Sequence, residues 1–430
     1  MSLSSSIPFE WPASWRSPDL LKLLDGGPIN TLLLPEGAAP EIRTAAVGRK
    51  LECPAQIPWS SWKEVNWRSG AEIVAINDGV WPDLSIKSQS NSADGVQGGP
   101  TGAPWLDANG WMLQLARCRA AGRPVWMKAP PPEKPETLNF STYLLAACEA
   151  SAYGARRPIW LPHAMVEGLA KANTAALSDW RKLMEFERWL ESHSAWGTWP
   201  ALARLLIVSD FSGANEYNSG EVLNLSARRN LAFLPVEKAK LAASDLAGRR
   251  AVLYADGDAM PASMVPLVQK FVEAGGLLLC MKGPAAAIRN TRPSREQHPR
   301  YTLLECGKGR VAVSKADWDD QFVVAQDTHL LMSRRHDALR LFNGGSITCY
   351  QTQSTDGGKW LAHLLNYAGR MPAHQVSLQT WQAIKGAKAY TPEKPQAVAL
   401  EIHREPGQQE VYLPTFSVYC AVELELTHHA

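Results

Sequence analysis

Through residues 1–197, short apolar runs alternate with segments that carry apolar residues at helical spacing. The apolar runs predict buried strands at Ile29–Leu34, Cys53–Trp59, Ala71–Ile76, Pro124–Lys128 and Arg157–Leu161. The segments between them predict helices at Pro40–Lys50, Gly110–Ala121, Ser141–Tyr153 and Ser178–His193, the last with a cap at Ser178-Asp179. Strand–helix alternation is typical of parallel β/α units. Residues 1–197 are therefore expected to form a (β/α) TIM-type barrel. It is short or degenerate, because only about five strands are recognisable where a complete barrel has eight.

A second alternation of strands and helices occupies residues 198–313. Strands are expected at Leu205–Asp210, Leu231–Pro235, Arg250–Tyr254 and Leu277–Met281, and helices at Glu221–Arg229 and Pro261–Ala274. Gly309–Val313 is expected to close the sheet. This order predicts a doubly wound, three-layer α/β domain. Its loops lack the GxGxxG and GxxxxGK[ST] patterns that hold phosphates, so nucleotide binding is not expected.

The last part of the chain alternates with period two. Trp360–Tyr367 predicts a half-buried strand, and Gln375–Trp381, Val398–His403, Val411–Leu413 and Ser417–Leu424 predict further short strands broken by Pro and Gly. This spacing favours a small β-sandwich over residues 344–430. Residues 314–343 are partly helical and basic, and they are expected to form a connector between the two units.

Two stretches resemble a known family. The phrases HLLNY, AKAYTPEKPQAVAL and VYLPTFSVYCAVELEL resemble the C-terminal β-sandwich of many bacterial glycoside hydrolases. The stretch AVLYADGDAMPASMVPLVQKFVEAGGLLLCM resembles the amidotransferase-like middle domain of trimerising β-galactosidases. The resemblance implies a carbohydrate substrate, a structural role for the middle domain and a homo-oligomer, dimer or trimer. A Cys nucleophile followed by a His partner is missing from that domain, so amidotransferase chemistry is not expected.

Composition narrows the function classes. A net charge of +2 does not indicate a basic surface for binding nucleic acid. No apolar run reaches the ~18 residues of a membrane span, and the start lacks the apolar core of a secretory signal. A cytoplasmic protein is therefore expected, with a secreted form whose signal has been trimmed as the alternative. Seven scattered cysteines without a CxxC pair predict neither a metal site nor a disulfide framework. The 17 tryptophans favour saccharides, because indole stacks on the apolar faces of sugar rings.

In barrel enzymes the substrate binds at the carboxyl ends of the strands, so the strand assignments give a candidate site. Asp78, Asp83 and Asp107 are the candidate catalytic carboxylates, one to donate a proton to the leaving oxygen and one to attack or activate water. The candidate substrate-binding residues are Glu36, Trp81, Trp105, Asn109, Lys128, Trp160, His163 and Glu167. No cofactor and no metal ligand is predicted.

Each candidate also has a structural interpretation. Asp78-Gly79 is a common turn pair, and Asp107 suits the N-terminus of the helix at Gly110. Retaining barrel glycosidases carry an Asn-Glu pair after a strand, whereas the single Asn-Glu here, Asn215-Glu216, lies outside the predicted barrel. The sequence therefore predicts a glycoside hydrolase with a carboxylate acid/base mechanism. The alternative is a non-catalytic carbohydrate-binding or scaffold protein on a degenerate glycosidase barrel.

Overall fold

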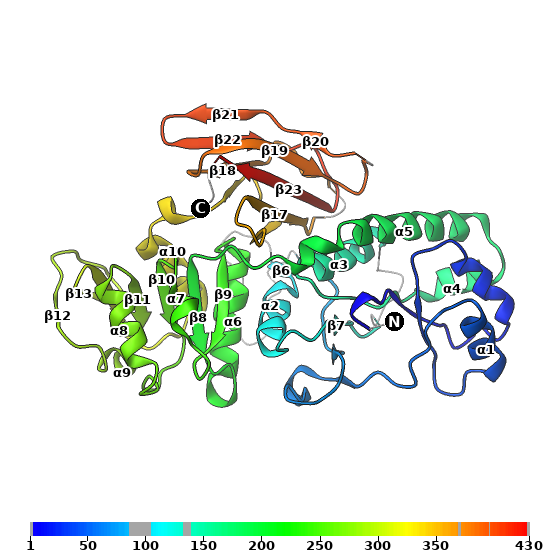
Figure 1. Cartoon of the computed structure of the whole chain (residues 1–430), viewed down its shortest axis with the longest axis horizontal. Coiled ribbons are helices and arrows are strands. Elements are labelled where there is room, and N and C mark those ends of the chain that lie inside the picture. The colour runs from blue at the N-terminus through cyan, green and yellow to red at the C-terminus, as the bar shows by residue number, and fades with distance from the viewer. Residues whose placement is uncertain (1–2, 86–104, 132–138, 369–370, 395, 428–430) are drawn as a thin grey trace, which may run out of the picture.

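The computed structural model describes residues 3–85, 105–131, 139–368, 371–394 and 396–427. Figure 1 shows an N-terminal unit at the right, an α/β unit at the left and an antiparallel sandwich above them. The chain is thus a multi-domain α/β protein with antiparallel β-sheets, as the sequence predicts. The barrel and the amidotransferase-like character of the middle unit stay predictions.

Six segments of the N-terminal unit are joined side by side by parallel pairing. They are β1 (Pro8–Glu10), β2 (Thr31–Leu33), residues 52–60 with β3 (Trp59–Ser60), β4 (Val74–Ile76), β7 (Val125–Met127) and residues 156–159. β1 pairs with β2, and β4 pairs with both β3 and β7. Single bridges join Thr31 to Glu52, Trp126 to Arg156 and Phe9 to Ile159. Because the last bridge returns to β1, the pairings form a ring.

Side chains alternate between the two faces of these strands, as the pleat requires. In β4, Val74 and Ile76 pack outward against the helices, whereas Ala75 clusters with the fully buried Trp126. The surrounding helices are α1 (Pro40–Gly48), α2 (Gly110–Arg119), α3 (Phe140–Ala152), α4 (His163–Ala170) and α5 (Thr174–Ser192). The hairpin of β5 (Asp83–Ser85) and β6 (Trp105–Asp107) is inserted between β4 and α2. Residues 86–104, between the two strands of this hairpin, lie outside the described residues.

Helix α5 corrects one predicted boundary. Its cap is Asn173, whose side-chain oxygen accepts hydrogen bonds from the backbone N–H groups of Ala175 and Ala176. The helix therefore begins four residues before Ser178, because an asparagine cap satisfies the free N–H groups of its first turn. The predicted strand at Arg157–Leu161 is not a continuous strand in the described residues. Isolated parallel bridges join Arg156 to Trp126 and Ile159 to Phe9, and the Trp160 N–H donates to the Tyr143 hydroxyl at 2.7 Å.

The α/β unit is a seven-stranded sheet in the order β12-β13-β14-β11-β10-β8-β9. Its strands are β8 (Leu205–Ser209), β9 (Phe233–Glu237), β10 (Ala251–Tyr254), β11 (Leu277–Cys280), β12 (Thr291–Pro293), β13 (Tyr301–Cys306) and β14 (Gly309–Ser314). Helices α6 (Glu216–Arg228) and α10 (Gln321–Met332) cover one face, and α8 (Val265–Glu273) covers the other, while the short α7 (Ala243–Leu246) and α9 (Lys282–Ala285) lie in connections. Because both faces are covered, Leu205 packs on one side and Leu206 on the other.

The expectation that Gly309–Val313 closes this sheet is wrong. β14 is internal, because β13 pairs with it antiparallel and β12 pairs in turn with β13. The tight connection from β13 to β14 passes through Gly307, whose φ of 58° suits glycine. A short hairpin therefore extends the sheet beyond the parallel strands.

The sandwich consists of two antiparallel sheets, β15-β18-β22-β21 and β16-β17-β23-β19-β20. Their strands are β15 (Arg340–Phe342), β16 (Ile347–Gln353), β17 (Lys359–Asn366), β18 (Ser377–Thr380), β19 (Ile384–Tyr390), β20 (Val398–Ala399), β21 (Ile402–Glu405), β22 (Gln408–Tyr412) and β23 (Tyr419–Leu426). The range 314–343, predicted as a connector, divides between the units. α10 packs into the α/β core, and β15 belongs to the sandwich.

Strand β17 is buried on both faces, whereas the sequence predicted a half-buried strand. Its Trp360 and Leu364 point into the sandwich core. Leu361 and Leu365 pack instead against Leu145 and other residues of α3 in the N-terminal unit. A strand between two cores has no solvated face, so its pattern of alternation does not report exposure.

Candidate functional site

Two oppositely charged side chains meet at the carboxyl ends of the ring strands. Lys128 follows β7 and Glu10 ends β1, and the Lys128 Nζ lies 3.2 Å from the Glu10 Oε1. The same ammonium lies 4.5 Å from the ring centroid of Trp59 in β3. The ion pair and the cation–π contact together hold Lys128 over this end of the ring.

A cluster of aromatic rings adjoins this pair. Trp81, in the loop after β4, packs 5.9 Å from Trp160 and 6.0 Å from Tyr143 between ring centroids. Its indole N–H donates to the Pro130 carbonyl oxygen at 2.8 Å, and the Arg157 guanidinium lies 4.1 Å over its ring. Burial lowers the pKa of Arg157 to about 10 and raises the pKa of Tyr143. Among the described residues, the Nη2 atom of Arg157 is buried without a hydrogen-bond partner.

The hairpin β5–β6 places two of the predicted catalytic carboxylates together. Asp83 and Asp107 are directly opposite each other in the antiparallel register. The Asp83 Oδ1 accepts a hydrogen bond from the Leu84 N–H at 2.8 Å. Asp107 interacts electrostatically with Arg228 of α6, so a positive charge lies close to one of the two carboxylates.

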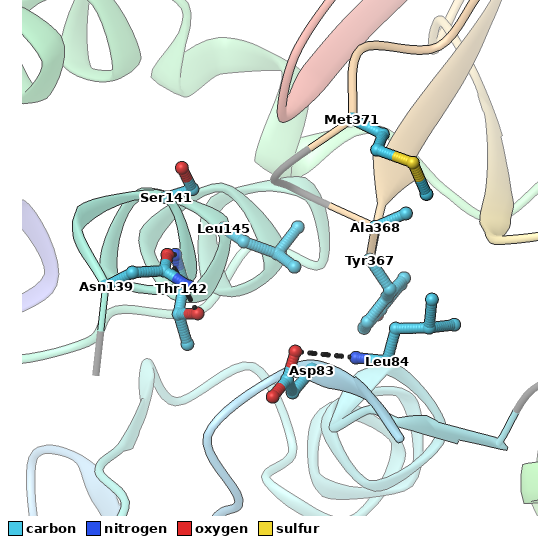
Figure 2. A pocket seen from close by; sticks show the side chains of 9 residues that line it. All are labelled: Asp83, Leu84, Asn139, Ser141, Thr142, Leu145, Tyr367, Ala368 and Met371. Atoms are coloured by element: carbon cyan, nitrogen blue, oxygen red, sulfur yellow. Dashed lines mark hydrogen bonds between the residues drawn. The ribbon is translucent and has the colours of Figure 1, made fainter. Parts of the chain in front are cut away.

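A cavity of about 300 Å³ opens beside Asp83. Figure 2 shows Asp83 and Leu84 on one side, Asn139, Thr142 and Leu145 of α3 on another, and Tyr367 and Met371 of the sandwich opposite. Asn139 caps α3 by accepting a hydrogen bond from the Thr142 N–H at 2.8 Å. The cavity is therefore built where the hairpin, the N-terminus of α3 and the sandwich meet.

Beneath this cavity lies a buried polar junction centred on Glu149 of α3, which is 1% exposed. Its carboxylate accepts hydrogen bonds from the Asn109 backbone N–H at 2.7 Å, the Asn109 side-chain amide at 2.6 Å and the Tyr367 hydroxyl at 2.7 Å. The Asn109 side chain also accepts a hydrogen bond from the Val80 N–H and donates one to the Val80 carbonyl oxygen. Burial raises the pKa of Glu149, and these hydrogen bonds oppose the increase.

A second polar cluster lies at the carboxyl ends of β8, β9 and β10. The Lys238 Nζ lies 2.9 Å from Asp210, 2.8 Å from Asp256 and 2.8 Å from Asp258. Asp256 is fully buried and also accepts a hydrogen bond from the Ser209 hydroxyl. β8 lies between β10 and β9, so the chain order reverses here, which is where doubly wound sheets usually bind ligands. In this chain the Lys238 ammonium fills that position.

No protein-family model and no curated protein sequence matches the chain. Among solved structures, α-L-fucosidase isoenzyme 2 from Paenibacillus thiaminolyticus aligns with 95% of this chain and 79% of its own, at a TM-score of 0.52 and 12% identity. The fold of this chain is therefore similar to that of a glycoside hydrolase. β-Galactosidases from Bacillus circulans sp. alkalophilus and Rahnella sp. R3 each align with 74% of the chain, with TM-scores of 0.49 and 0.46 and identities of 11% and 13%. The chain spans 57% of the length of each β-galactosidase, and at such identities the likeness concerns the fold alone.

On this glycoside-hydrolase-like fold, the sequence-predicted residues fall into separate groups. Trp81 and Trp160 adjoin each other, Lys128 lies at the same end of the ring, and Asp83 and Asp107 pair on the hairpin. The Trp105 backbone pairs with Ser85 in the hairpin, and its side chain is not among the described groups.

The other predicted residues are placed apart from the cavity beside Asp83. Asp78 is exposed, and its Oδ2 accepts a hydrogen bond from the Trp62 N–H at 2.8 Å. Glu36 is exposed after β2. His163 and Glu167 lie on the exposed face of α4, 3.7 Å apart, and Glu167 lines a different groove of about 820 Å³. Asn109 is 2% exposed and serves the Glu149 junction.

Sequence reasoning missed Glu10, Trp59, Arg157 and the junction of Glu149 with Tyr367. Glu10 ends a three-residue strand that carries no long apolar run, so the strand was not recognised. Arg157 was treated as part of a strand, and Tyr367 as part of the sandwich. Arg157, three residues before Trp160, is a signal in the sequence for a functional position, because a cation inside an apolar segment is rarely buried without a partner.

In the part of the chain that the structure describes, no three His, Cys, Asp or Glu side chains are grouped to hold a metal ion. Within the same residues, no helix combines the length and apolar character that crossing a membrane requires.

Replacing Tyr367 with phenylalanine should lower the free energy of unfolding by about 2 kcal/mol. The change removes one of three donors to a buried carboxylate, and hydrogen bonds to charged groups contribute about 1.5–3 kcal/mol each. The measurement is the urea midpoint at pH 7. Tyr217→Phe is the control, because Tyr217 is 75% exposed. Equal midpoints for both variants would show that the Tyr367 hydroxyl does not stabilise the junction.

Proposed function

We propose that the protein hydrolyses glycosidic bonds, with Asp83 and Asp107 as the pair of carboxylates. The single observation that supports this most is their position directly opposite each other on β5 and β6. Directly opposed residues have Cβ atoms about 4.5–5.5 Å apart and project from the same face of the hairpin. That spacing is close to the roughly 5–5.5 Å between the two carboxyl groups of retaining glycosidases.

The surroundings suggest which carboxylate takes which role. Asp107 has the Arg228 charge nearby, which suits the ionised group that attacks the anomeric carbon. Asp83 lines the cavity, so we assign it as the acid that protonates the leaving oxygen. In the first half of the reaction the Asp107 carboxylate would form a covalent bond to the anomeric carbon as the protonated leaving group departs. In the second half Asp83 would take a proton from water, which attacks the anomeric carbon and breaks the bond to Asp107.

The ring of parallel segments supports the same proposal. We infer that it is a short (β/α) barrel, whose carboxyl-end loops carry Trp81, Lys128, Trp160 and the β5–β6 hairpin. Barrel enzymes build their active sites from such loops. The likeness in fold to the α-L-fucosidase, which extends over 95% of the chain, supports the choice of glycoside hydrolysis as the reaction class.

The proposal is tested by screening aryl glycosides with the wild type and with the variants Asp83→Asn and Asp107→Asn. An amide keeps the shape of a carboxylate but can neither donate a proton nor attack as an anion, so each variant should lose about 10²-fold or more in kcat/KM. Asp19→Asn is the matched control, because Asp19 is an exposed residue paired only with Lys22 in the described structure. A cleaved substrate on which both variants retain full activity would exclude this pair.

One observation favours the alternative, a non-catalytic carbohydrate-binding protein on a degenerate barrel. The ring of parallel segments in the described residues has six members, fewer than the eight strands of a complete barrel. If the wild type cleaves no aryl glycoside but binds oligosaccharide by calorimetry, the alternative is correct.

A further inference from the structure

A separate cleft of about 370 Å³ lies between the N-terminal unit and the α/β unit. One wall is the segment after β3, residues 62–68, and the other is formed by the loops that follow β8 and β9. Clefts between domains and at the carboxyl ends of α/β strands are where ligand pockets usually occur. This cleft satisfies both conditions and shares no lining residue with the cavity beside Asp83.

The first wall is aromatic and held in place. Trp62 and Trp67 meet edge to face with ring centroids 5.0 Å apart. The Arg119 guanidinium lies 5.9 Å and 5.5 Å from the two ring centroids. Arg119 is 9% exposed and donates to the carbonyl oxygens of Asp210 and Phe211, each at 2.9 Å. The two indole rings are therefore positioned by a buried cation that is itself anchored across the domain boundary.

The second wall carries carboxylates in fixed positions. Glu237 is held by Arg119 at 3.1 Å and by Lys240. Asp210 is held by Lys238 at 2.9 Å and by the Asn215 amide at 3.2 Å. Asp210 also accepts a hydrogen bond from the Ser212 N–H at 3.1 Å, so its oxygens are largely used. Glu237 has one cation on each oxygen and retains acceptor capacity, because a carboxylate has four lone-pair directions.

The backbone next to these carboxylates is strained. Phe211 has a φ of 48°, in the left-handed region that is unfavourable for a side chain such as phenylalanine. Phe211 follows Asp210 at the end of β8. Its backbone N–H donates a hydrogen bond to the Ser209 hydroxyl oxygen at 2.8 Å, which fixes this conformation. Strain of this kind persists where the surroundings fix an unusual conformation, and such positions cluster at binding sites.

We propose that this cleft binds a neutral saccharide at a site separate from Asp83 and Asp107. Indole rings that face fixed hydroxyl acceptors are the combination that pyranose rings fit, since their C–H faces stack and their hydroxyls donate. A neutral ligand is chosen because the lining carries charges of both signs, including Lys63, Arg68 and Glu216, and because Asp210 and Glu237 are already paired with cations. The choice of a saccharide rests on the proposed function, whereas the geometry of the cleft does not.

The cleft is also connected to the end of the ring. The backbone N–H of Trp62 donates to the Asp78 carboxylate at 2.8 Å, and Asp78 stands two residues beyond β4. A sugar that packs on Trp62 would therefore contact a segment fixed to the loop that leads to the β5–β6 hairpin.

The test is ¹⁹F NMR of the full chain labelled with 5-fluorotryptophan, titrated with D-galactose, L-fucose and lactose. Resonances are assigned by the single changes Trp62→Phe, Trp67→Phe, Trp81→Phe and Trp160→Phe. The expected result is a saturable shift of the Trp62 and Trp67 resonances with at least one sugar. Glu237→Gln should weaken that binding about tenfold, because an amide is a poorer acceptor and leaves Arg119 without its charge partner.

Asp83→Asn should leave the shifts of Trp62 and Trp67 unchanged, so this site is distinguishable from the carboxylate pair. Saturable shifts confined to Trp81 and Trp160 would place sugar binding at the strand ends and overturn the second site. No saturable shift at Trp62 or Trp67 with any of the three sugars would also overturn it. Glycoside cleavage is scored separately, so a failure of the hydrolase proposal does not decide this one.

Discussion

Replacing Lys238 with methionine should lower the stability of the α/β unit by about 3–5 kcal/mol, the usual cost of removing one partner of a buried ion pair. The Lys238 ammonium lies within 2.9 Å of three carboxylates, one of which, Asp256, is fully buried. Hydrogen bonds to these carboxylates raise the pKa of Lys238, although its partial burial opposes the increase. Methionine keeps most of the length of the side chain but removes its positive charge, so three carboxylates are left facing one another.

The measurement is amide hydrogen exchange in β8 and β10, because a chain with several units need not unfold in one step. Asp258→Asn is the matched control. Asp258 is 57% exposed, so removing its charge should cost less than about 1 kcal/mol. If both variants accelerate exchange equally, Lys238 does not hold the ends of β8 and β10 together.

Lowering the pH from 7 to 4.5 should destabilise the protein by several kcal/mol through a single histidine, His363 of β17. The side chain is 1% exposed, and burial lowers its pKa from 6.5 to about 3, with the nearby Arg117 charge adding to the effect. Its Nδ1 lies 2.7 Å from the Tyr419 hydroxyl, and Tyr350 stacks on the ring. The unfolded chain therefore binds a proton below pH 6.5 that the folded chain does not bind until about pH 3.

The sign of this effect is fixed by the direction of the shift. Stability from a depressed pKa is fully present above pH 6.5 and is lost as the pH falls toward 3. At about 1.4 kcal/mol for each unit of difference, the full loss is on the order of 5 kcal/mol, and roughly half or more falls between pH 7 and 4.5.

The check is a series of urea midpoints between pH 7 and 4.5 for the wild type and for His363→Gln. Glutamine retains a hydrogen-bonding side chain but cannot be protonated, so the variant should have a shallower pH dependence. Glu187 also titrates here, because burial raises its pKa to about 7, but its contribution is common to both proteins. Parallel pH profiles would show that His363 is not the group responsible.

The helices at Gly110 and Ser141 and the strands of the α/β sheet could be predicted because their periodicity is local. Pairing partners could not. Nothing in the pattern of Tyr301–Cys306 shows that it folds back on β14, and nothing in Trp360–Tyr367 shows that a second core covers it. Burial depends on what packs against a strand, which period-two alternation does not encode.

The candidate site shows the same division. The rule that chemistry lies at strand ends brought Trp81, Lys128 and Trp160 into one list, and the structure places them at one end of the ring. The pairing of Asp83 with Asp107 depends on a hairpin register across an insertion, which the sequence did not specify. Glu10 was missed because a three-residue strand gives too few positions for a periodic signal.

Strand β17 also has a consequence for synthesis. The apolar face of α3 that receives Leu361 and Leu365 leaves the ribosome about 200 residues before β17 does. At roughly 5–20 residues per second, that face waits on the order of 10–40 s for its partner. During this interval the nascent chain exposes Leu145 and its neighbours. Chaperone capture or intermolecular association at this step would then limit the yield of folded protein, even for variants whose finished fold is fully stable.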